Sequence, residues 1–361
     1  MMYSKHLLKR GFASQVSHKF PENTVAGLYK RAVAENQYYD AVRFGAQKFN
    51  WTVKEMDRYS SAFAHGLVES GYQRGDKLLL WADQTNSAEI LVSQLGSLKA
   101  GVSVVTFDEK DNIDSFHHAL QNSDAKGLLF SPQTVISKEA DGHSVTRKTF
   151  LQKLMPELEG MYPGDELALK NYPHLKQIIQ LGHHSIRGVI KYKDSMVYAN
   201  PQLSTFEIPE NKAEDVAFVS YQNGKRVSAY SNGEITEHAQ KLWSEIFSSS
   251  NDSHPVYMSL NLETPLALAS FIANNANLQK VYIPSTFNVN KIVESIKTQQ
   301  SQILVCDADL YTLEAPKERQ SEFEGYAASI KQSVVASSEG QNIGRSSLYK
   351  GETRVLDPYR L

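Results

Sequence analysis

Short apolar runs alternate with amphipathic stretches of helical period along the first third of the chain, and this alternation constrains the fold most. Residues 77–82, 102–107 and 127–130 are almost continuously apolar, as in strands that are buried on both faces. Residues 87–100 and 111–122 lie between them and have the length and period of helices. Strand–helix–strand order at these lengths predicts a parallel sheet with right-handed crossovers.

A second set of the same kind follows a polar, irregular stretch at 131–174, a candidate strand at 177–181 and a loop at 191–209. Its strands are predicted at 215–220, 256–260, 281–284 and 303–306, and its helices at 234–248, 264–275 and 289–300. From Glu314 onward the chain is polar and has no sustained apolar period, which is typical of an extended arm. The predicted fold class is α/β, with two parallel-sheet subdomains flanked by helices, the second one truncated, and a polar C-terminal arm.

This organisation divides the chain into four parts. They are a transit-like N-terminal segment at 1–19, a first α/β subdomain with an irregular connection at 20–210, a second, truncated α/β subdomain at 211–313, and the C-terminal arm at 314–361. A truncated sheet leaves an unpaired edge, which is a liability for a free monomer. We therefore expect other protein subunits to bind the arm and the truncated edge.

Charge and cysteine content exclude several classes of protein. The formal net charge is -2, which gives no basis for binding nucleic acid or a polybasic contact with a membrane. Cys306 is the only cysteine, so an internal disulfide framework and a cysteine-based zinc site are excluded. No apolar run approaches the roughly 18 residues that a transmembrane helix needs. Any association with a membrane is therefore expected to go through a partner.

The first 14 residues differ from the rest of the chain. They include Lys5, Lys9 and Arg10, no acidic residue, and a short apolar face at Leu7 and Leu8. A cationic, amphipathic and acid-poor start is typical of a mitochondrial transit peptide, and the segment 10–14 resembles a matrix-protease cleavage context. The alternative is a basic terminus that is simply frayed. We favour the transit peptide, which predicts a mitochondrial protein.

Several short phrases, in a shared order, resemble the N-terminal domain of adenylate-forming enzymes such as acyl-CoA synthetases. The phrases are FNWTVKEMD at 49–57, LVESGYQRGDK at 67–77, LGSLKAGV at 95–102, NSDAKGLL at 122–129 and FNVNKIVESI at 287–296. In the first of them, Thr52 and Glu55 have the spacing of a capping box at the start of a helix. The resemblance covers about residues 20–312, weakly between 131 and 210, and implies the fold of that domain.

Active members of the family hold the triphosphate of ATP with a loop rich in glycine and hydroxyl residues that ends in Pro-Lys-Gly. The matching stretch here, 215–234, keeps its flanks but has Gly224 as the only glycine between Asp215 and Asn232. The degenerate phosphate-loop position consists of Tyr221, Gln222, Asn223, Gly224, Lys225 and Arg226. One interpretation is a surviving phosphate site in which Lys225 or Arg226 replaces the loop lysine. The other, which we favour, is a plain strand–turn–helix connection with its turn at Asn223 and Gly224.

The resemblance also implies parts that this sequence does not contain. The adenine pocket, the magnesium-binding YGxTE segment, the TGD ribose carboxylate and the catalytic lysine would follow Cys306, and none of these phrases is found there. Interactions that act only as a set are lost together. We therefore expect no catalytic residue, no cofactor, no metal and no cofactor-binding site.

Other candidate groups have simpler interpretations. The adjacent pairs His117–His118 and His183–His184 do not place two rings on one face, so surface or capping roles are favoured over zinc. Cys306 ends an apolar strand and is predicted to be buried. A Ser–Lys dyad of Ser228 or Ser231 with Lys225 lacks an oxyanion-stabilising group. The last group is an acidic run, predicted to be solvated, of Glu207, Glu210, Glu214 and Asp215.

These expectations together predict a pseudoenzyme. It would be a non-catalytic acyl-CoA synthetase-like protein that serves as a structural accessory subunit of a mitochondrial assembly. The leading candidate is a membrane respiratory complex, with the protein on the matrix side and peripheral to the inner membrane. Two alternatives stay open, a residual acyl- or nucleotide-binding module and one half of a split acyl-CoA or acid ligase.

Overall fold

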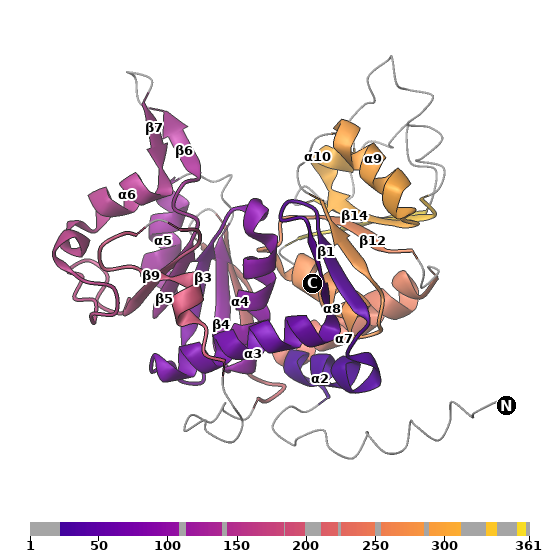
Figure 1. Ribbon diagram of the computed structural model, residues 1–361, viewed down its shortest axis with the longest axis horizontal. Helices are drawn as coiled ribbons and strands as arrows, with labels where there is room; N and C mark the ends of the chain where they lie inside the picture. Colours follow the sequence, from indigo (N-terminus) through magenta and orange to yellow (C-terminus); the bar gives the residue numbers. More distant parts are fainter. Residues whose placement is uncertain are drawn as a thin grey trace. The chain divides into compact units, whose positions relative to one another are not determined.

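The computed structural model describes ten stretches of the chain. They are residues 22–107, 113–138, 143–183, 185–198, 211–222, 225–249, 254–284, 289–311, 330–337 and 352–358. The predicted transit segment at 1–19 lies outside them. The chain divides into two compact units (Figure 1): Arg58–Ser231, which we call the central unit, and Met1–Asp57 with Asn232–Leu361, which we call the split unit.

The central unit is built on a seven-stranded sheet with the order β11-β10-β4-β3-β5-β8-β9. Its strands are β3 (Lys77–Trp81), β4 (Ser103–Phe107), β5 (Gly127–Phe130), β8 (Gln177–Gln180), β9 (Ile190–Lys191), β10 (Val216–Gln222) and β11 (Lys225–Ser231). All neighbours are parallel except β10 and β11, which form an antiparallel hairpin. The predicted parallel sheet is thus confirmed, with one antiparallel strand at its edge.

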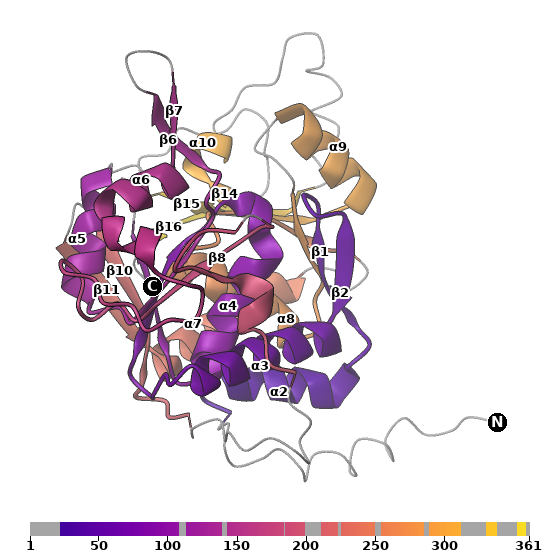
Figure 2. The same ribbon diagram turned by 60° about the vertical axis from the view of Figure 1, so that its left-hand side comes forward.

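Helices cover both faces of this sheet. They are α3 (Val53–Glu69, which runs across the division between the units), α4 (Ser87–Lys99), α5 (Ile113–Ser123) and α6 (Arg147–Leu154). Helices α4 and α5 lie on opposite faces of the sheet (Figures 1 and 2), and all five residues of β4 are buried between them. A small hairpin of β6 (Val135–Lys138) and β7 (Ser144–Thr146) precedes α6.

The start of α3 has the predicted capping box. The Thr52 backbone N–H donates to Glu55 Oε2 at 2.7 Å, and the Glu55 N–H donates to Thr52 Oγ1 at 3.2 Å. Two N–H groups that lack partners within the helix are satisfied in this way. The spacing of two residues in the sequence therefore predicted a specific pair of hydrogen bonds.

The split unit has a second seven-stranded sheet, with the order β16-β15-β14-β12-β13-β1-β2. Its strands are β1 (Asp40–Phe44), β2 (Phe49–Thr52), β12 (Val256–Ser259), β13 (Val281–Ile283), β14 (Ile303–Asp307), β15 (Gln332–Ala336) and β16 (Glu352–Leu356). Strand β1 pairs in parallel with β13 and antiparallel with β2. This pairing groups the N-terminal elements with the second sheet, whereas the predicted domain range 20–210 placed them with the first.

The helices of the split unit are α2 (Val25–Asn36), α7 (Asn232–Glu245), α8 (Pro265–Asn275), α9 (Val289–Gln299) and the single turn α10 (Ala308–Tyr311). Helices α2, α7 and α8 lie on one face of the sheet, and α9 and α10 lie on the other (Figures 1 and 2). The sheet therefore has helices on both faces, as strands that read as continuous apolar runs require.

The C-terminal region corrects one prediction. Strand β15 pairs in parallel with β14, and β16 pairs in parallel with β15, so the sheet continues beyond β14. Val334 and Val335 point to opposite faces of the sheet and both have 0% exposure, which means that β15 is covered on both faces. The predictions of an extended arm from residue 314 and of a sheet edge at β14 are wrong for these residues. Each strand is only five residues long, and long polar connections hide the two short apolar segments from a search for a sustained period.

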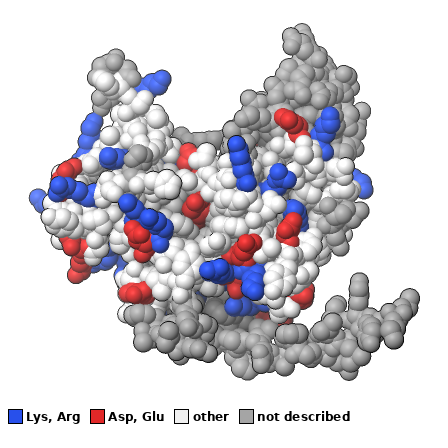
Figure 3. Space-filling model, viewed as in Figure 1, with Lys and Arg blue, Asp and Glu red and all other residues white. Residues whose placement is uncertain are grey.

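The described surface has no large area of one charge on the face shown in Figure 3, where basic and acidic side chains of the described residues are interspersed. This agrees with a net charge near zero.

Within the described stretches, no helix is both long enough and apolar enough to cross a membrane.

Candidate functional site

The phosphate-loop position is a β-hairpin. Strands β10 and β11 pair from Val216↔Ser231 to Gln222↔Lys225, so only two residues separate the last two paired residues. Tyr221 and Gln222 end β10, and Lys225 and Arg226 begin β11. Asn223 and Gly224 between them lie outside the described residues. The predicted strand–turn–helix connection is corrected to strand–turn–strand, and helix α7 follows β11.

Tyr221 has a structural role in this hairpin. Its ring is 5% exposed and belongs to the apolar core of the central unit. Its hydroxyl donates to the backbone carbonyl of Asn122 at 3.0 Å, in the last turn of α5. Burial raises the pKa of Tyr221, and the nearby Arg226 charge lowers it in part. The side chain thus fastens β10 to α5 in its neutral form, and its hydroxyl satisfies a carbonyl that a helix end leaves unpaired.

Lys225 and Arg226 are both exposed at the start of β11. Neither side chain has an ion-pair partner among the described residues. Backbone groups flanking the turn are committed to the ladder between β10 and β11, which leaves few N–H groups that could turn toward a phosphate. The two cations are exposed, and the described residues on both sides of the turn are paired strands.

The carboxyl ends of β3 and β4 are filled by aromatic side chains. Trp81 stacks on Phe116 with ring centroids 4.1 Å apart, and Phe107 and Phe150 pack against them. Open α/β sheets bind ligands at the carboxyl edge of their strands. Here the described part of that edge around β3 is packed core.

Arg147, which the sequence did not single out, is buried beside this cluster. Its side chain is 1% exposed, Nη1 donates to the Trp81 carbonyl at 2.7 Å, and the guanidinium lies 4.8 Å from the centroid of the Trp81 ring. A buried cation over an aromatic face is stabilised by the ring quadrupole. Arg147 starts α6, and no local pattern distinguishes it from an exposed arginine on a helix.

A cleft of about 650 Å³ opens at the opposite, amino edge of the sheet. It is lined by Arg74, Gly75, Lys77, Gly101, Ser103, Asn122, Asp124, Asp215, Val216, Val219, Tyr221 and Arg226. All of these residues belong to the central unit. The cleft lies where β3, β4 and β10 begin and where α5 ends, so it is bounded by strand starts, a helix end and the hairpin.

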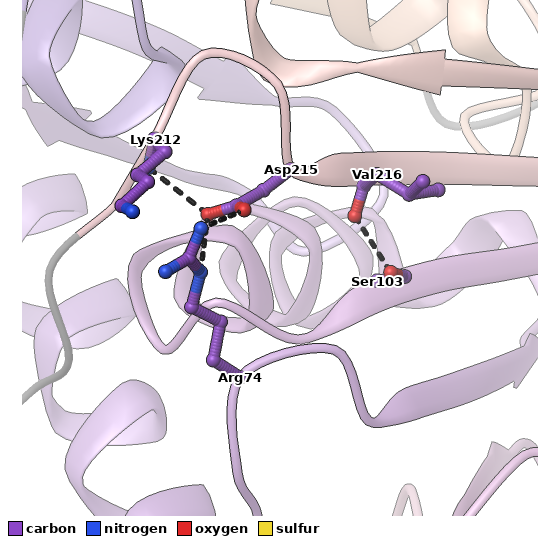
Figure 4. A network of polar contacts seen from close by, with 5 residues as sticks. All are labelled: Arg74, Ser103, Lys212, Asp215 and Val216. Carbon is purple, nitrogen blue, oxygen red and sulfur yellow. Dashed lines mark hydrogen bonds and ion pairs between the residues drawn. The ribbon is translucent and has the colours of Figure 1, made fainter.

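Asp215 organises one wall of this cleft (Figure 4). Its carboxylate accepts from Arg74 Nε at 2.8 Å, from Arg74 Nη2, and from the Lys212 backbone N–H at 2.9 Å. The Ser103 hydroxyl donates to the Val216 carbonyl at 2.6 Å beside it. Asp215 is therefore a paired residue that ties the start of β10 to the turn before β3, and its predicted place in a solvated acidic run is wrong. Glu214 is exposed, and Glu207 and Glu210 lie outside the described residues.

The remaining sequence candidates lie apart from this cleft. His117 Nδ1 is 2.6 Å from the Tyr172 hydroxyl, and the ring centroids of His117 and His118 are 6.0 Å apart. Cys306 is buried, as predicted, and burial raises the pKa of its thiol. Ser228 and Ser231 lie on β11 and are half-buried, and His184 lies outside the described residues. In the part of the chain that the structure describes, no group of three or more His, Cys, Asp or Glu could hold a metal ion.

The fold defines a class of protein. Solved structures of adenylate-forming ligases superpose on most of this chain. The coronafacic acid ligase of Pectobacterium brasiliense has a TM-score of 0.63 and 14% identity, covering 87% of this chain and 56% of that chain. The fatty acyl CoA synthetase of Mycobacterium tuberculosis has a TM-score of 0.61 and 14% identity, covering 87% and 55%. At this identity the likeness concerns the fold, and it confirms the predicted architecture of two largely parallel sheets.

The family follows from the sequence itself. A family model described as AMP-binding enzyme matches residues 29–222, which is more than half of the chain. The chain belongs to this family, and the predicted resemblance is confirmed. A Bacillus subtilis protein named as an acyl-CoA synthetase, YngI, is 25% identical over 177 residues, which are 49% of this chain and 30% of that protein. A mitochondrial medium-chain acyl-CoA ligase of Mus musculus is 27% identical over 128 residues, or 36% and 18% of the two lengths. The chain therefore matches less than a third of the length of either relative.

Proposed function

We propose that this protein is a non-catalytic member of the family that acts as a structural accessory subunit of a mitochondrial assembly. The observation that carries the first part is the β10–β11 ladder, which pairs Gln222 with Lys225 at the phosphate-loop position. Adenylation requires a triphosphate to be held and its developing charge to be stabilised. The hairpin supplies one lysine and one arginine side chain, Lys225 and Arg226, but no glycine-rich backbone that could surround a triphosphate.

Calorimetry with ATP and Mg²⁺ tests this part directly. We expect no saturable binding below millimolar concentration, where the free energy of binding is about -4 kcal/mol. The control is the double variant Lys225→Ala with Arg226→Ala, which removes both exposed cations of the hairpin. Micromolar affinity in the natural protein that the double variant loses would mean that a phosphate site survives, and the pseudoenzyme proposal would be abandoned.

The accessory role is supported by the edges of the split unit. Strand β16 ends the order of the described strands, and its backbone offers hydrogen-bonding groups on one side. The sequence pattern predicted the open edge at β14, but β15 and β16 lie there. A partner strand or loop that covers β16 would remove this liability. A membrane respiratory complex is our leading candidate for the assembly, with the protein on the matrix side and peripheral to the inner membrane.

The mitochondrial location is tested with the N-terminal segment. Residues 1–14 fused to a reporter should direct it to mitochondria because the segment is cationic and acid-poor. The matched control changes Lys5, Lys9 and Arg10 to Glu, which keeps the length and inverts the charge. Cytosolic signal from the unmutated fusion would refute the proposed location.

The second candidate function is one half of an acid–CoA ligase that works with a separate chain. The names of the relatives favour it, because the matched proteins are called acyl-CoA synthetases and ligases. Purification of the natural protein from mitochondria at high salt distinguishes the candidates. Retention of non-ligase subunits supports the accessory role, and retention of a chain that contains the TGD and catalytic-lysine segments supports the split ligase. A residual acyl- or nucleotide-binding module would instead retain a small molecule.

A further inference from the structure

One side of the amino-edge cleft of the central unit is formed by an ion pair. Arg74 and Asp215 form an ion pair on the wall, and their side chains are 35% and 14% exposed. Since the carboxylate also accepts from the Lys212 N–H, its acceptor sites are largely used. This pair contributes shape to the cleft but little net charge.

The end of α5 is neutralised by two lining residues. Lys77 Nζ donates to the Ser123 carbonyl at 2.6 Å, and the Tyr221 hydroxyl donates to the Asn122 carbonyl at 3.0 Å. Carbonyls at the C-terminus of a helix otherwise make that end partly negative and unfavourable for an anion. Here the two carbonyls nearest the cleft are satisfied, and Lys77 adds a full positive charge beside them.

Two of the residues that line the cleft are glycines in turns, Gly75 and Gly101. Gly75 and Gly101 have φ values of +91° and +72°, a region that residues with a Cβ rarely adopt. A Cβ on Gly101 would lie 3.2 Å from Arg74 Cγ, so a side chain at this position would push against the arginine. The Gly75 N–H donates to the Gly101 carbonyl at 2.9 Å, which joins the two turns. At these two positions the lining of the cleft is backbone, and no side chain projects from it.

Arg226, Asp124 and Arg74 are the exposed charged residues of the lining, and of these Arg226 and Asp124 have no ion-pair partner among the described residues. Together the lining has three cationic and two acidic side chains, so its balance is positive. A guanidinium offers several N–H donors in one plane, which match the geometry of a carboxylate or phosphate. Asp124 opposes such a ligand by repulsion and limits its affinity.

We propose that this cleft binds a small oxyanion, a carboxylate or a phosphate, with Arg226 as its main contact and Lys77 as a second cation. The site lies at the amino edge of the sheet. A ligand bound in the cleft would not add backbone N–H donors around the hairpin turn. The proposal that the protein does not form acyl adenylates therefore stands whether or not the cleft is occupied. The apolar part of the lining, Val216 and Val219, would accommodate a short carbon skeleton attached to the anionic group.

The test is calorimetry on the full chain with two probes used separately, inorganic phosphate and acetate. Arg226→Gln should weaken the binding of the preferred probe about tenfold, because it removes a charge-assisted hydrogen bond. Asp124→Asn should strengthen binding about two- to fivefold, because it removes a nearby like charge. Lys225→Gln is the matched control: it is the neighbouring exposed cation of the same hairpin but does not line the cleft.

The results distinguish a phosphate ligand from a carboxylate ligand and show whether the cleft is the binding site. Tighter binding of phosphate than of acetate indicates a phosphate ligand, and the reverse order indicates a carboxylate. Binding that Lys225→Gln leaves within about twofold of the natural protein supports the cleft, because an exposed charge that does not touch the ligand is screened by water and salt. If neither probe binds saturably, or if Lys225→Gln weakens binding as much as Arg226→Gln, the proposal is wrong.

Discussion

At the scale of single residues, Tyr221 and Asp215 determine how this family member differs from one with an open phosphate loop. Tyr221 places a buried ring where such a loop needs small residues, and its hydroxyl is bonded to α5. Asp215 fixes the start of the same strand to the turn before β3 through Arg74. Both contacts stabilise β10 as a regular strand of the sheet, which is a structural role and does not require a ligand.

The first prediction concerns the Asp215 clamp. Asp215→Ala removes an acceptor for the Arg74 guanidinium and for the Lys212 N–H, so it should lower the free energy of unfolding by about 1–2 kcal/mol. The expected change is small because Arg74 is partly exposed and water screens the pair. Urea unfolding measures the change. The neighbouring Glu214→Ala, at an exposed position, should stay within about 0.5 kcal/mol of the natural protein, and an equal effect of both would contradict the clamp.

The second prediction concerns alkaline pH. Burial raises the pKa of Tyr172 from 10.0 to about 12. A group whose pKa is higher in the folded state binds its proton more tightly there, so its contribution to stability is complete below about pH 10. That contribution is lost as the pH rises through 12.

Urea unfolding at a series of pH values between 8 and 12 checks this dependence. The natural protein should lose stability above about pH 10 more steeply than the Tyr172→Phe variant, which has no proton to release at this position. The control is Tyr162→Phe, because Tyr162 is 72% exposed and should leave the dependence unchanged. Parallel curves for the natural protein and Tyr172→Phe would rule out the assigned group.

At the scale of secondary-structure elements, the longer and more regular segments followed the sequence patterns closely. The predicted strand at 127–130 is β5, and the predicted helix at 264–275 is α8 within one residue. A continuous apolar run marked β5 and an apolar stretch of helical length marked α8, so local patterns were enough to find them.

The elements that the sequence patterns did not reveal depend on tertiary pairing. Strand β11 is only half-buried, so its sequence has no strong strand pattern, and its pairing with β10 defines it as a strand. Strands β15 and β16 are short and are flanked by long polar connections, and β1 and β2 are joined by a short turn within a mixed segment. The cleft was missed for the same reason, since Arg74, Asn122 and Arg226 are far apart in sequence and only the sheet brings them together. Lys225 and Arg226 were candidates from the sequence because they are adjacent in the stretch that matches the phosphate loop of the family.

The third prediction follows from β15. A chain that ends after Tyr311 lacks β15 and β16 and exposes the buried strand β14 along one edge. We expect the split unit to lose cooperative unfolding or to aggregate, because an open edge and buried Val334 and Val335 are lost together. Circular dichroism during urea unfolding and limited proteolysis measure this. A truncated chain with natural stability would show that the two strands are dispensable appendages.

At the scale of the whole molecule, the chain has the fold of its family and a β-hairpin at the position where the resemblance implied a phosphate loop. Each unit has its own seven-stranded sheet with helices on both faces, so the loss of catalysis proposed here needs no loss of fold. Folds and functions separate in this way because a site depends on a few residues, whereas a sheet depends on many. The proposed accessory role uses the preserved scaffold and its strand edges.

The measurement that tests the central claim most directly is acid-dependent exchange of pyrophosphate into ATP by the purified full-length protein. The exchange reports formation of an acyl adenylate, whatever group accepts the acyl chain afterwards. With a panel of short-, medium- and long-chain fatty acids, we expect a rate equal to that without protein, and the Lys225→Ala, Arg226→Ala variant should show the same rate. Exchange above that background, dependent on the added acid and abolished in the double variant, would show that the hairpin handles ATP and that the protein is an enzyme.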